Sequence, residues 1–343
     1  MRTSTILLGL TLICLSISNL WLSQSCGAGG ANTPLDMETL KKTLSHVRGE
    51  AKTDEGWPRV IEYEHAHYDF RKDGFYNEER TFTVRSQPSR IIPHAVGVSE
   101  ILWAICPRER IVAFNELSAD PDISFIADQV KKDFPVLNSR QTEVVIGYQP
   151  DLVFTVFYSD ADFKEKLEQA KIPFFDLGYF GTIESIKKQI LLIGRVVGEE
   201  GNAGALVNVM DEKILALKKR IPKIDKLIRV LYYDDGGYIP GKASNFESIC
   251  DIIGVVNVGA EQGIKSWSQI DYETLLKWNP DIIVVREGSH LREQLMASEV
   301  LSLARAIQKG KVYDIPGVYL TAHSQYMLLS ANLLAGIVYE NLL

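Results

Sequence analysis

Histidines are the residues of this chain most able to ligate a metal, and two pairs of them have suggestive spacing. His65 and His67 lie two apart in a strand-like segment, so both side chains face one side and could chelate a metal ion. No cysteine or acidic motif with metal-site spacing accompanies them, which favours a solvated strand edge. His94 and His323 each flank an element expected to end at a cleft, where either could be structural or could contact a ligand or its metal centre.

Arginine and aromatic side chains offer a second kind of chemistry, the binding of a large flat ligand. Arg286 directly follows the apolar run "DIIVV", the place where open α/β sheets bind ligands outside the carboxyl ends of their strands. It could pair there with a ligand carboxylate, or form a surface salt bridge. Four further residues combine flat apolar area with a polar tip, which suits either a planar ligand or simple packing: Tyr158, Tyr238, Trp267 and Tyr319.

One motif occurs twice in the chain. "TEVVIGYQPDLVFTV" at 142–156 and "YETLLKWNPDIIVV" at 272–285 both place a glutamate seven residues before Pro-Asp and follow it with an apolar run. Each copy predicts a short helix, a turn and a buried strand. Glu143 and Glu273 fall in the first helical turn, where an acid complements the helix dipole by roughly 0.3 to 1 kcal/mol. The matched position in both copies favours a shared function beyond that effect.

These units belong to a longer alternation of apolar strands and amphipathic helices, which predicts an α/β fold with two Rossmann-like lobes built on parallel sheets. A strand hairpin turning at Asp73 and Gly74 opens the N-terminal lobe, expected at 59–183. Linking helices follow at 184–222, and the C-terminal lobe occupies 223–343. Apolar residues at helical spacing predict one long helix over 202–221, capped by Asn202, that should restrict opening of the lobes.

The first residues of the chain have the pattern of an export signal. Residues 1–25 contain one positive charge, an uncharged apolar stretch and small residues, which predicts a cleaved signal peptide rather than a membrane anchor. Cys26 and the glycine-rich run after it resemble a bacterial lipoprotein junction, so residues 26–58 are expected to form a lipid-anchored tether with one helix. Cys106 and Cys250 have apolar neighbours, which predicts buried small side chains rather than a disulfide or metal pair.

The export signal, the paired glutamate units, the linking helix and the stretch "LARAIQKGKVYDIPG" together resemble the helical-backbone substrate-binding proteins of ABC importers, from about residue 59 to the C-terminus. The resemblance implies a ligand such as cobalamin, a ferric siderophore or haem, captured between two lobes. It implies that Glu143 and Glu273 dock onto a permease dimer with its ATPase subunits. It also implies a location in the periplasm or at the outer cell surface, with lipid attachment at Cys26.

Two stretches resemble ligand-facing places in the cobalamin-binding branch of that family. They are Trp267, six residues before Glu273, and "GGYIPGKAS" at 236–244, which contains Tyr238. In the other lobe, Phe157 and Tyr158 follow the strand, whereas Leu137 stands where that branch often has tryptophan. The ligand-binding residues expected from all these arguments are His94, Phe157, Tyr158, Tyr238, Trp267, Arg286, Tyr319 and His323.

Composition and missing motifs limit the other functions. A net charge of −7 without a basic patch argues against nucleic acid as a partner. The near P-loop at 236–243 has Ala243 in place of the magnesium-binding hydroxyl. An exported α/β hydrolase would need a nucleophile motif that is missing from the sequence, and we expect neither catalysis nor a cofactor beyond metal carried by the ligand. A transport protein for bare zinc or manganese, bound by His94, Glu116 and His323, remains the alternative.

Overall fold

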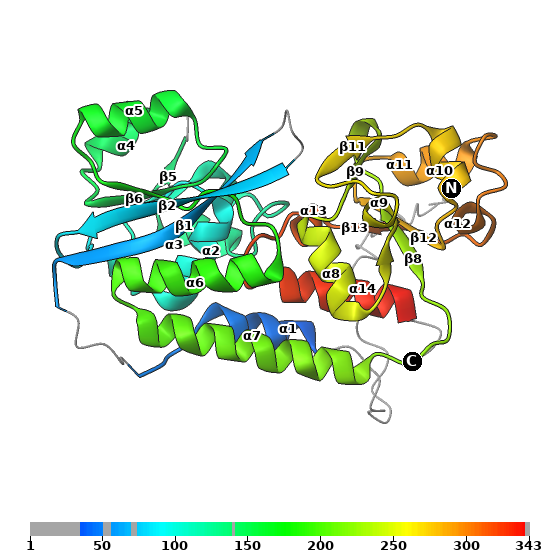
Figure 1. Ribbon diagram of the computed structural model, residues 1–343, viewed down its shortest axis with the longest axis horizontal. Helices are drawn as coiled ribbons and strands as arrows, with labels where there is room; N and C mark the ends of the chain where they lie inside the picture. The colour runs from blue at the N-terminus through cyan, green and yellow to red at the C-terminus, as the bar shows by residue number, and fades with distance from the viewer. Residues whose placement is uncertain (1–34, 51–55, 70–73, 139–140, 340–343) are drawn as a thin grey trace, which may run out of the picture.

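The computed structural model describes residues 35–50, 56–69, 74–138 and 141–339, and all structural statements concern these residues. The expected signal peptide and Cys26 lie outside them. Two lobes stand side by side on a common layer of helices (Figure 1). Each lobe is centred on a parallel β-sheet, so the α/β fold with two parallel-sheet lobes is confirmed.

The N-terminal lobe contains a three-stranded sheet in the order β3-β6-β7, a two-stranded ladder β4-β5 and the antiparallel hairpin β1-β2. The central strand β6 is buried along its whole length because helices and the hairpin cover it, as its continuous apolar run predicts. The elements of this lobe are β1 (Arg59–Asp69), β2 (Gly74–Val84), β3 (Ile91–Pro93), α2 (Val96–Ile105), η2 (Arg108–Arg110), β4 (Phe114–Asn115), η3 (Glu116–Ala119), α3 (Ala127–Asp133), β5 (Val136–Leu137), α4 (Thr142–Gly147), β6 (Leu152–Thr155), α5 (Ala161–Gln169) and β7 (Phe174–Asp176).

The C-terminal lobe contains a four-stranded parallel sheet in the order β10-β8-β12-β13, with a small antiparallel pair β11-β9 above it. Its central strand β12 is buried except at its last residue. The elements are β8 (Arg229–Tyr232), η4 (Asp235–Gly237), β9 (Tyr238–Pro240), α8 (Asn245–Ile253), β10 (Val256–Asn257), α9 (Val258–Glu261), β11 (Trp267–Gln269), α10 (Tyr272–Trp278), β12 (Ile282–Arg286), α11 (Leu291–Ala297), α12 (Arg305–Gln308), β13 (Val312–Ile315), α13 (Gly317–Leu320) and α14 (Met327–Tyr339).

Helices α6 (Ile183–Val197) and α7 (Glu200–Arg220) join the lobes. The turn between them uses Gly198 at φ 73°, a backbone angle that favours glycine. The long helix expected at 202–221 is confirmed as α7, whose 21 residues span about 31 Å. We had expected Asn202 to be its N-cap, and this expectation is wrong. The helix begins two residues earlier. The side-chain amide of Asn202 donates to the carbonyl of Ile105 and accepts from the backbone amide of Gly49.

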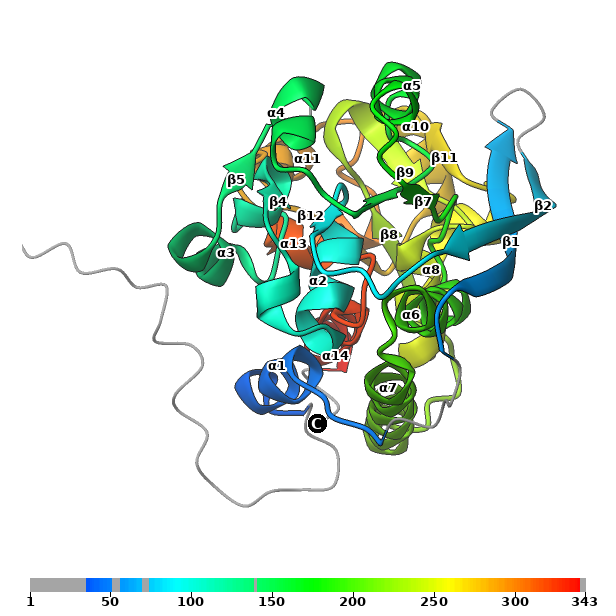
Figure 2. The same ribbon diagram turned by 90° about the vertical axis from the view of Figure 1, so that its left-hand side faces the viewer.

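The helical layer beneath the sheets is shared by both lobes, with α1 (Met37–Ser45), α7 and α14 on the lower side of Figures 1 and 2. Leu40 and Leu44 bury α1 against α2, α7 and α14, so this part of the expected tether is folded onto the body. One continuous core includes Leu206 of α7, Phe154 of β6 and Val284 of β12. Such a core resists large hinge opening.

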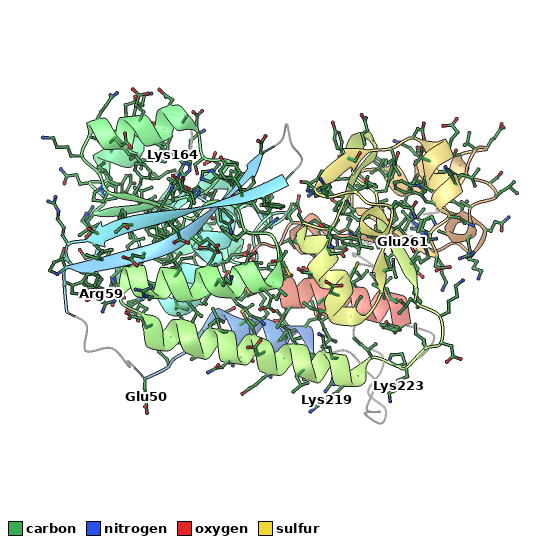
Figure 3. All side chains as sticks on the ribbon, viewed as in Figure 1. Glu50, Arg59, Lys164, Lys219, Lys223 and Glu261 are labelled. Atoms are coloured by element: carbon green, nitrogen blue, oxygen red, sulfur yellow. The ribbon has the colours of Figure 1, made fainter. Side chains whose placement is uncertain are left out.

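The base of the hairpin is fixed to the same layer. Arg59, marked in Figure 3, pairs with Glu200 of α7 and donates to the carbonyl of Arg195. The other end of β1 joins the lobe through the amide of Tyr179, which donates to the carbonyl of Ala66 at 2.8 Å. Among the described residues, no helix combines the length and apolar character needed to cross a membrane.

Candidate functional site

A cavity of about 380 Å³ lies between the lobes, and residues from both lobes line it. Its N-terminal wall comes from the loops after β6 and β7 and the start of α2, because parallel strands deliver their following loops to one edge of the sheet. The facing wall comes from Ser266 and Trp267 of the C-terminal lobe. The size suits a small organic ligand.

Exposed aromatic side chains form the cavity walls. Phe157 and Tyr158 follow β6 and are 39% and 61% exposed, and Trp267 on the opposite lobe is 45% exposed. Phe157 is supported by Tyr179, with ring centroids 4.9 Å apart, and Trp267 stands edge-on to Tyr232 at 5.9 Å. Three solvent-exposed aromatics facing one space are costly for a monomer unless a ligand covers them. The cavity therefore offers flat apolar surfaces from both lobes.

His323 also lines this cavity. Its Nδ1 is 2.7 Å from the carbonyl oxygen of Thr321, so Nδ1 carries the proton and donates. Burial lowers the pKa of His323, which keeps the imidazole neutral. A neutral ring fixed in this tautomer has its lone pair on Nε2, the usual arrangement of a metal-ligating histidine.

Glu100 of α2 is the cavity residue that sequence reasoning missed most clearly, since it lies in the apolar helix "EILWAI". Its carboxyl is 1% exposed and accepts hydrogen bonds from the amide of Phe125 at 2.8 Å and the hydroxyl of Ser324 at 2.5 Å. Burial raises the pKa of Glu100 to about 7, against the opposing effect of these bonds. Tyr179 was also missed, although its place just after a strand could have indicated it.

His94 opens into a neighbouring cavity of about 420 Å³, which shares Ala95, Leu117 and Tyr158 with the first. Its ring stacks on Phe163, with centroids 4.0 Å apart, and Nδ1 is 3.4 Å from the hydroxyl of Ser159. His94 and His323 therefore line adjoining cavities rather than one. Within the described residues, His94, Glu116 and His323 do not bring their ligand atoms together as a metal site.

Besides His94, three of the expected ligand-binding residues lie outside the lining of the cavity between the lobes. Arg286, at the end of β12, has Nε 4.0 Å from an Asp234 oxygen. Tyr319 packs edge-on against Phe125, with centroids 5.1 Å apart. Tyr238 is 47% exposed at the start of β9.

Glu143 and Glu273 occupy the first turns of α4 and α10, as their motif predicts. Both side chains are exposed, and both helices lie on the upper side of the two lobes in Figures 1 and 2. Backbone hydrogen bonding at Glu143 itself, together with Lys166 at 3.5 Å, lowers the pKa of that carboxyl. The two acids thus point into solvent from matching places of the two lobes.

The hairpin histidines differ from expectation. His65 is 2% exposed, so the solvated strand edge is wrong for this residue. Its ring packs at 4.2 Å from that of His67, on the face of the hairpin that covers β7. Cys106 and Cys250 are buried free thiols, as expected, and burial raises the pKa of Cys106 to about 12.

Two α/β lobes on a shared helical layer, with an aromatic cavity between them, define a two-lobed ligand-binding protein. The periplasmic binding protein family model matches residues 97–319, which is most of the chain, and the chain belongs to this family. It is the solute-binding component of an ABC transporter, and the family binds solutes rather than catalysing a reaction. A permease and a small ligand are its partners.

Similar proteins support this assignment. The ABC transporter substrate-binding lipoprotein YvrC of Bacillus subtilis is 24% identical over 268 residues, covering 76% of this chain and 82% of its own. A cobalamin-binding protein of Halobacterium salinarum is 22% identical over 204 residues, which are 59% of this chain and 55% of its own. The periplasmic haem-binding protein RhuT of Roseiflexus superimposes with a TM-score of 0.64 at 17% identity, over 74% of this chain and 98% of its own.

Proposed function

We propose that this chain captures a planar metal chelate, either haem or a cobalamin-type corrinoid, between its lobes and delivers it to an ABC permease. The observation that carries the proposal is His323, a half-buried neutral imidazole in the lining of an aromatic cavity. Its Nδ1 proton is committed to the Thr321 carbonyl, so Nε2 is the nitrogen available to iron or cobalt.

The cavity lining supports a flat, largely apolar ligand over an anionic one. Phe157, Tyr158 and Trp267 can sandwich a ring system, with offset or edge contacts on both faces. Among the described residues, the lining contains neither lysine nor arginine, the residues that would neutralise the several charges of a highly anionic siderophore. The halobacterial relative that binds cobalamin and the structural relative that binds haem both have ligands of this planar, metal-centred kind.

Delivery to the permease would use Glu143 and Glu273. Their exposure, their matched positions and their common side of the two lobes suit a symmetric permease dimer that presents one basic pocket to each lobe. ATPase subunits would then drive transfer. We further propose that the chain is exported, acts in the periplasm or at the outer cell surface, and is held to the membrane by acylation of Cys26, as the lipoprotein name of the Bacillus relative suggests.

The test is a ligand panel on the purified chain from residue 27. Haem, cobalamin and a ferric siderophore are titrated in turn, and absorption spectra are recorded. We expect tight binding of haem or cobalamin, with a spectral change that reports a nitrogen ligand on the metal. His323→Ala should remove that spectral change and weaken binding.

The matched control is His290→Asn, because His290 is exposed, does not line the cavity and has φ 59°, a conformation that asparagine tolerates. This variant should bind as the wild type does. Binding of the siderophore alone, or a metal-ligand spectrum that survives in His323→Ala, would contradict the proposal.

A further inference from the structure

The covered face of the β1-β2 hairpin gathers two imidazoles and a carboxylate. His65 and His67 project to the same side of β1, and His65 stands directly opposite Glu78 in the antiparallel register. His65 Nδ1 lies 2.9 Å from His67 Nε2, which lies 3.1 Å from a Glu78 oxygen. We infer that His65, His67 and Glu78 form a binding site for a late first-row divalent transition metal ion, outside the cavity between the lobes.

The spacing of the three donor atoms fits tetrahedral coordination. Zinc bonds to histidine nitrogen and carboxylate oxygen measure about 2.0 to 2.2 Å, so neighbouring ligand atoms of a tetrahedron are separated by about 3.3 to 3.5 Å. The observed separations of 2.9 and 3.1 Å are a few tenths of an ångström shorter, and all three donor atoms lie within 4.8 Å of one another. Small side-chain rotations would open the space for an ion, with water as the fourth ligand.

Asp176 provides the support that a ligating histidine needs. The second ring nitrogen of His65, Nε2, lies 3.2 Å from an Asp176 oxygen, which sets Nδ1 as the nitrogen that faces the ion. Asp176 also accepts a hydrogen bond from Lys164 at 2.9 Å, which fixes the position of its carboxyl. Figure 3 marks Lys164 below α5, on the side of the strands. Asp176 thus lies where it can orient the His65 ring.

The positively charged guanidinium of Arg80 lies beside these donor atoms. It lies 2.8 Å from Glu78, 3.4 Å from His67 Nε2 and 3.7 Å from Asp176. An arriving metal ion would displace it, and its side chain, 32% exposed, can turn into solvent while the ion takes over its charge. Glu78 is 53% exposed and His67 26%, so ions can enter from solvent.

The donor set determines the class of ion. Two imidazoles with one carboxylate favour zinc, copper or nickel over magnesium and calcium, which prefer oxygen ligands. None of the three residues lines the cavity between the lobes, so this site is independent of the transported ligand. A bound ion would connect β1 to β2, and through Asp176 to β7, and so stiffen this side of the N-terminal lobe.

Calorimetry with zinc chloride on the tag-free chain from residue 27 tests the site. One zinc ion should bind per chain, and cobalt should give the intense visible absorption of a tetrahedral complex. His67→Ala should abolish this binding. Asp176→Asn should weaken it about 10- to 100-fold, the usual effect of removing the partner of a metal-bound histidine. Arg80→Gln should strengthen it by removing the competing cation, a result that a purely structural cluster would not give.

His290→Asn and the cavity variant His323→Ala serve as controls and should keep wild-type zinc affinity, with folding of every variant checked by circular dichroism. Zinc binding that is lost in His323→Ala but kept in His67→Ala would place the ion in the cleft and overturn the inference. A wild-type chain that binds no zinc, or an Arg80→Gln variant that binds it more weakly, would do the same. The haem and cobalamin titrations are read separately, so either proposal can fail alone.

Discussion

The two Pro-Asp units of this chain build the same turn from different helices. In the N-terminal lobe, Asp151 accepts from the backbone amides of Ser89 and Arg90, and the Arg90 side chain caps carbonyls at the end of α4. In the C-terminal lobe, Asp281 accepts from the amide of Arg229, whose side chain caps the end of α10. The residue before each proline, Gln149 or Asn279, has φ near 50°.

The units diverge where they face other molecules. After β6 the chain places Phe157 and Tyr158 in the cavity, whereas the last residue of β12, Arg286, lies beside Asp234. Glu143 has Lys166 as a neighbour, whereas no ion pair of Glu273 is found in the described part of the chain. The residues that close the helix-turn-strand backbone are therefore similar in the two units, whereas the residues that would contact the ligand differ.

Removal of the turn aspartates should have the largest effect. Asp281 also pairs with Arg305, so Asp281→Ala leaves the Arg305 guanidinium and the backbone amide of Arg229 without their acceptor. We expect it to lower the free energy of unfolding by about 3 kcal/mol and Asp151→Ala by about 2 kcal/mol, measured by urea unfolding.

Asp225→Ala, at an exposed position, is the control and should stay within about 0.5 kcal/mol of the wild type. If only one of the two turn variants is destabilised, the turns are not energetically equivalent. That result would break the comparison of the lobes.

Much of the fold followed from local pattern, because apolar runs such as 152–155 and 282–286 bounded by Pro-Asp can only be buried strands here. The features that were missed depend on contacts between distant segments. His65 is buried beside Asp176, more than 100 residues away, and the Glu100 carboxyl accepts hydrogen bonds from Ser324, Phe125 and Ser124. A periodic sequence pattern records which face is apolar, but it does not record which polar group will find a distant partner.

The cavity aromatics allow a test of the diverged part of the lobes. Trp267→Ala should weaken ligand binding by about 2 kcal/mol, about thirtyfold in Kd, because a large ring covering the ligand is lost. Tyr238→Ala is the matched control, since its ring is similarly exposed at 47% but does not line the cavity. Fluorescence titration with the ligand selected by the panel measures both. Equal losses would extend the site to Tyr238, and no loss in either would reassign Trp267 to packing.

The exposed glutamates should affect transport without affecting binding. We expect Glu143→Ala combined with Glu273→Ala to reduce cellular uptake about tenfold, and each single change about threefold, since each lobe contributes one salt-sensitive contact. Ligand affinity of the purified double variant should equal that of the wild type. Glu38→Ala, another exposed first-turn acid but on α1 at the opposite side, should transport normally. A double variant with normal uptake would remove the functional reason for the repeated motif.

The lobes also differ in how α8 and α2 bind the segment 320–324, which contacts both of them. On α8, the amide of Asn245 donates to the carbonyls of Leu320 and Ala322. On α2, the buried carboxyl of Glu100 binds the same segment by accepting a hydrogen bond from the hydroxyl of Ser324. An amide cannot titrate in the physiological range, whereas a carboxyl can. Of these two contacts, only the one made by Glu100 should therefore change in stability with pH.

The sign of that dependence follows from the raised pKa of Glu100. The carboxyl has a pKa of 4.5 as an ordinary group and about 7 in its buried place, so the folded protein holds a proton that the unfolded chain has released. Stability from this group is complete below pH 4.5 and is lost as pH rises through about 7. Between about pH 5.5 and 6.5 the loss should be about 1 kcal/mol, and Glu100→Gln, which keeps the shape and resembles the amide of the other lobe, should remove it. Urea unfolding of both proteins across this range measures the difference in slope, with Glu38→Ala as a control that keeps the wild-type slope. A wild-type protein that instead gains stability relative to Glu100→Gln as pH rises would mean that the carboxyl is ionised at this inter-lobe contact.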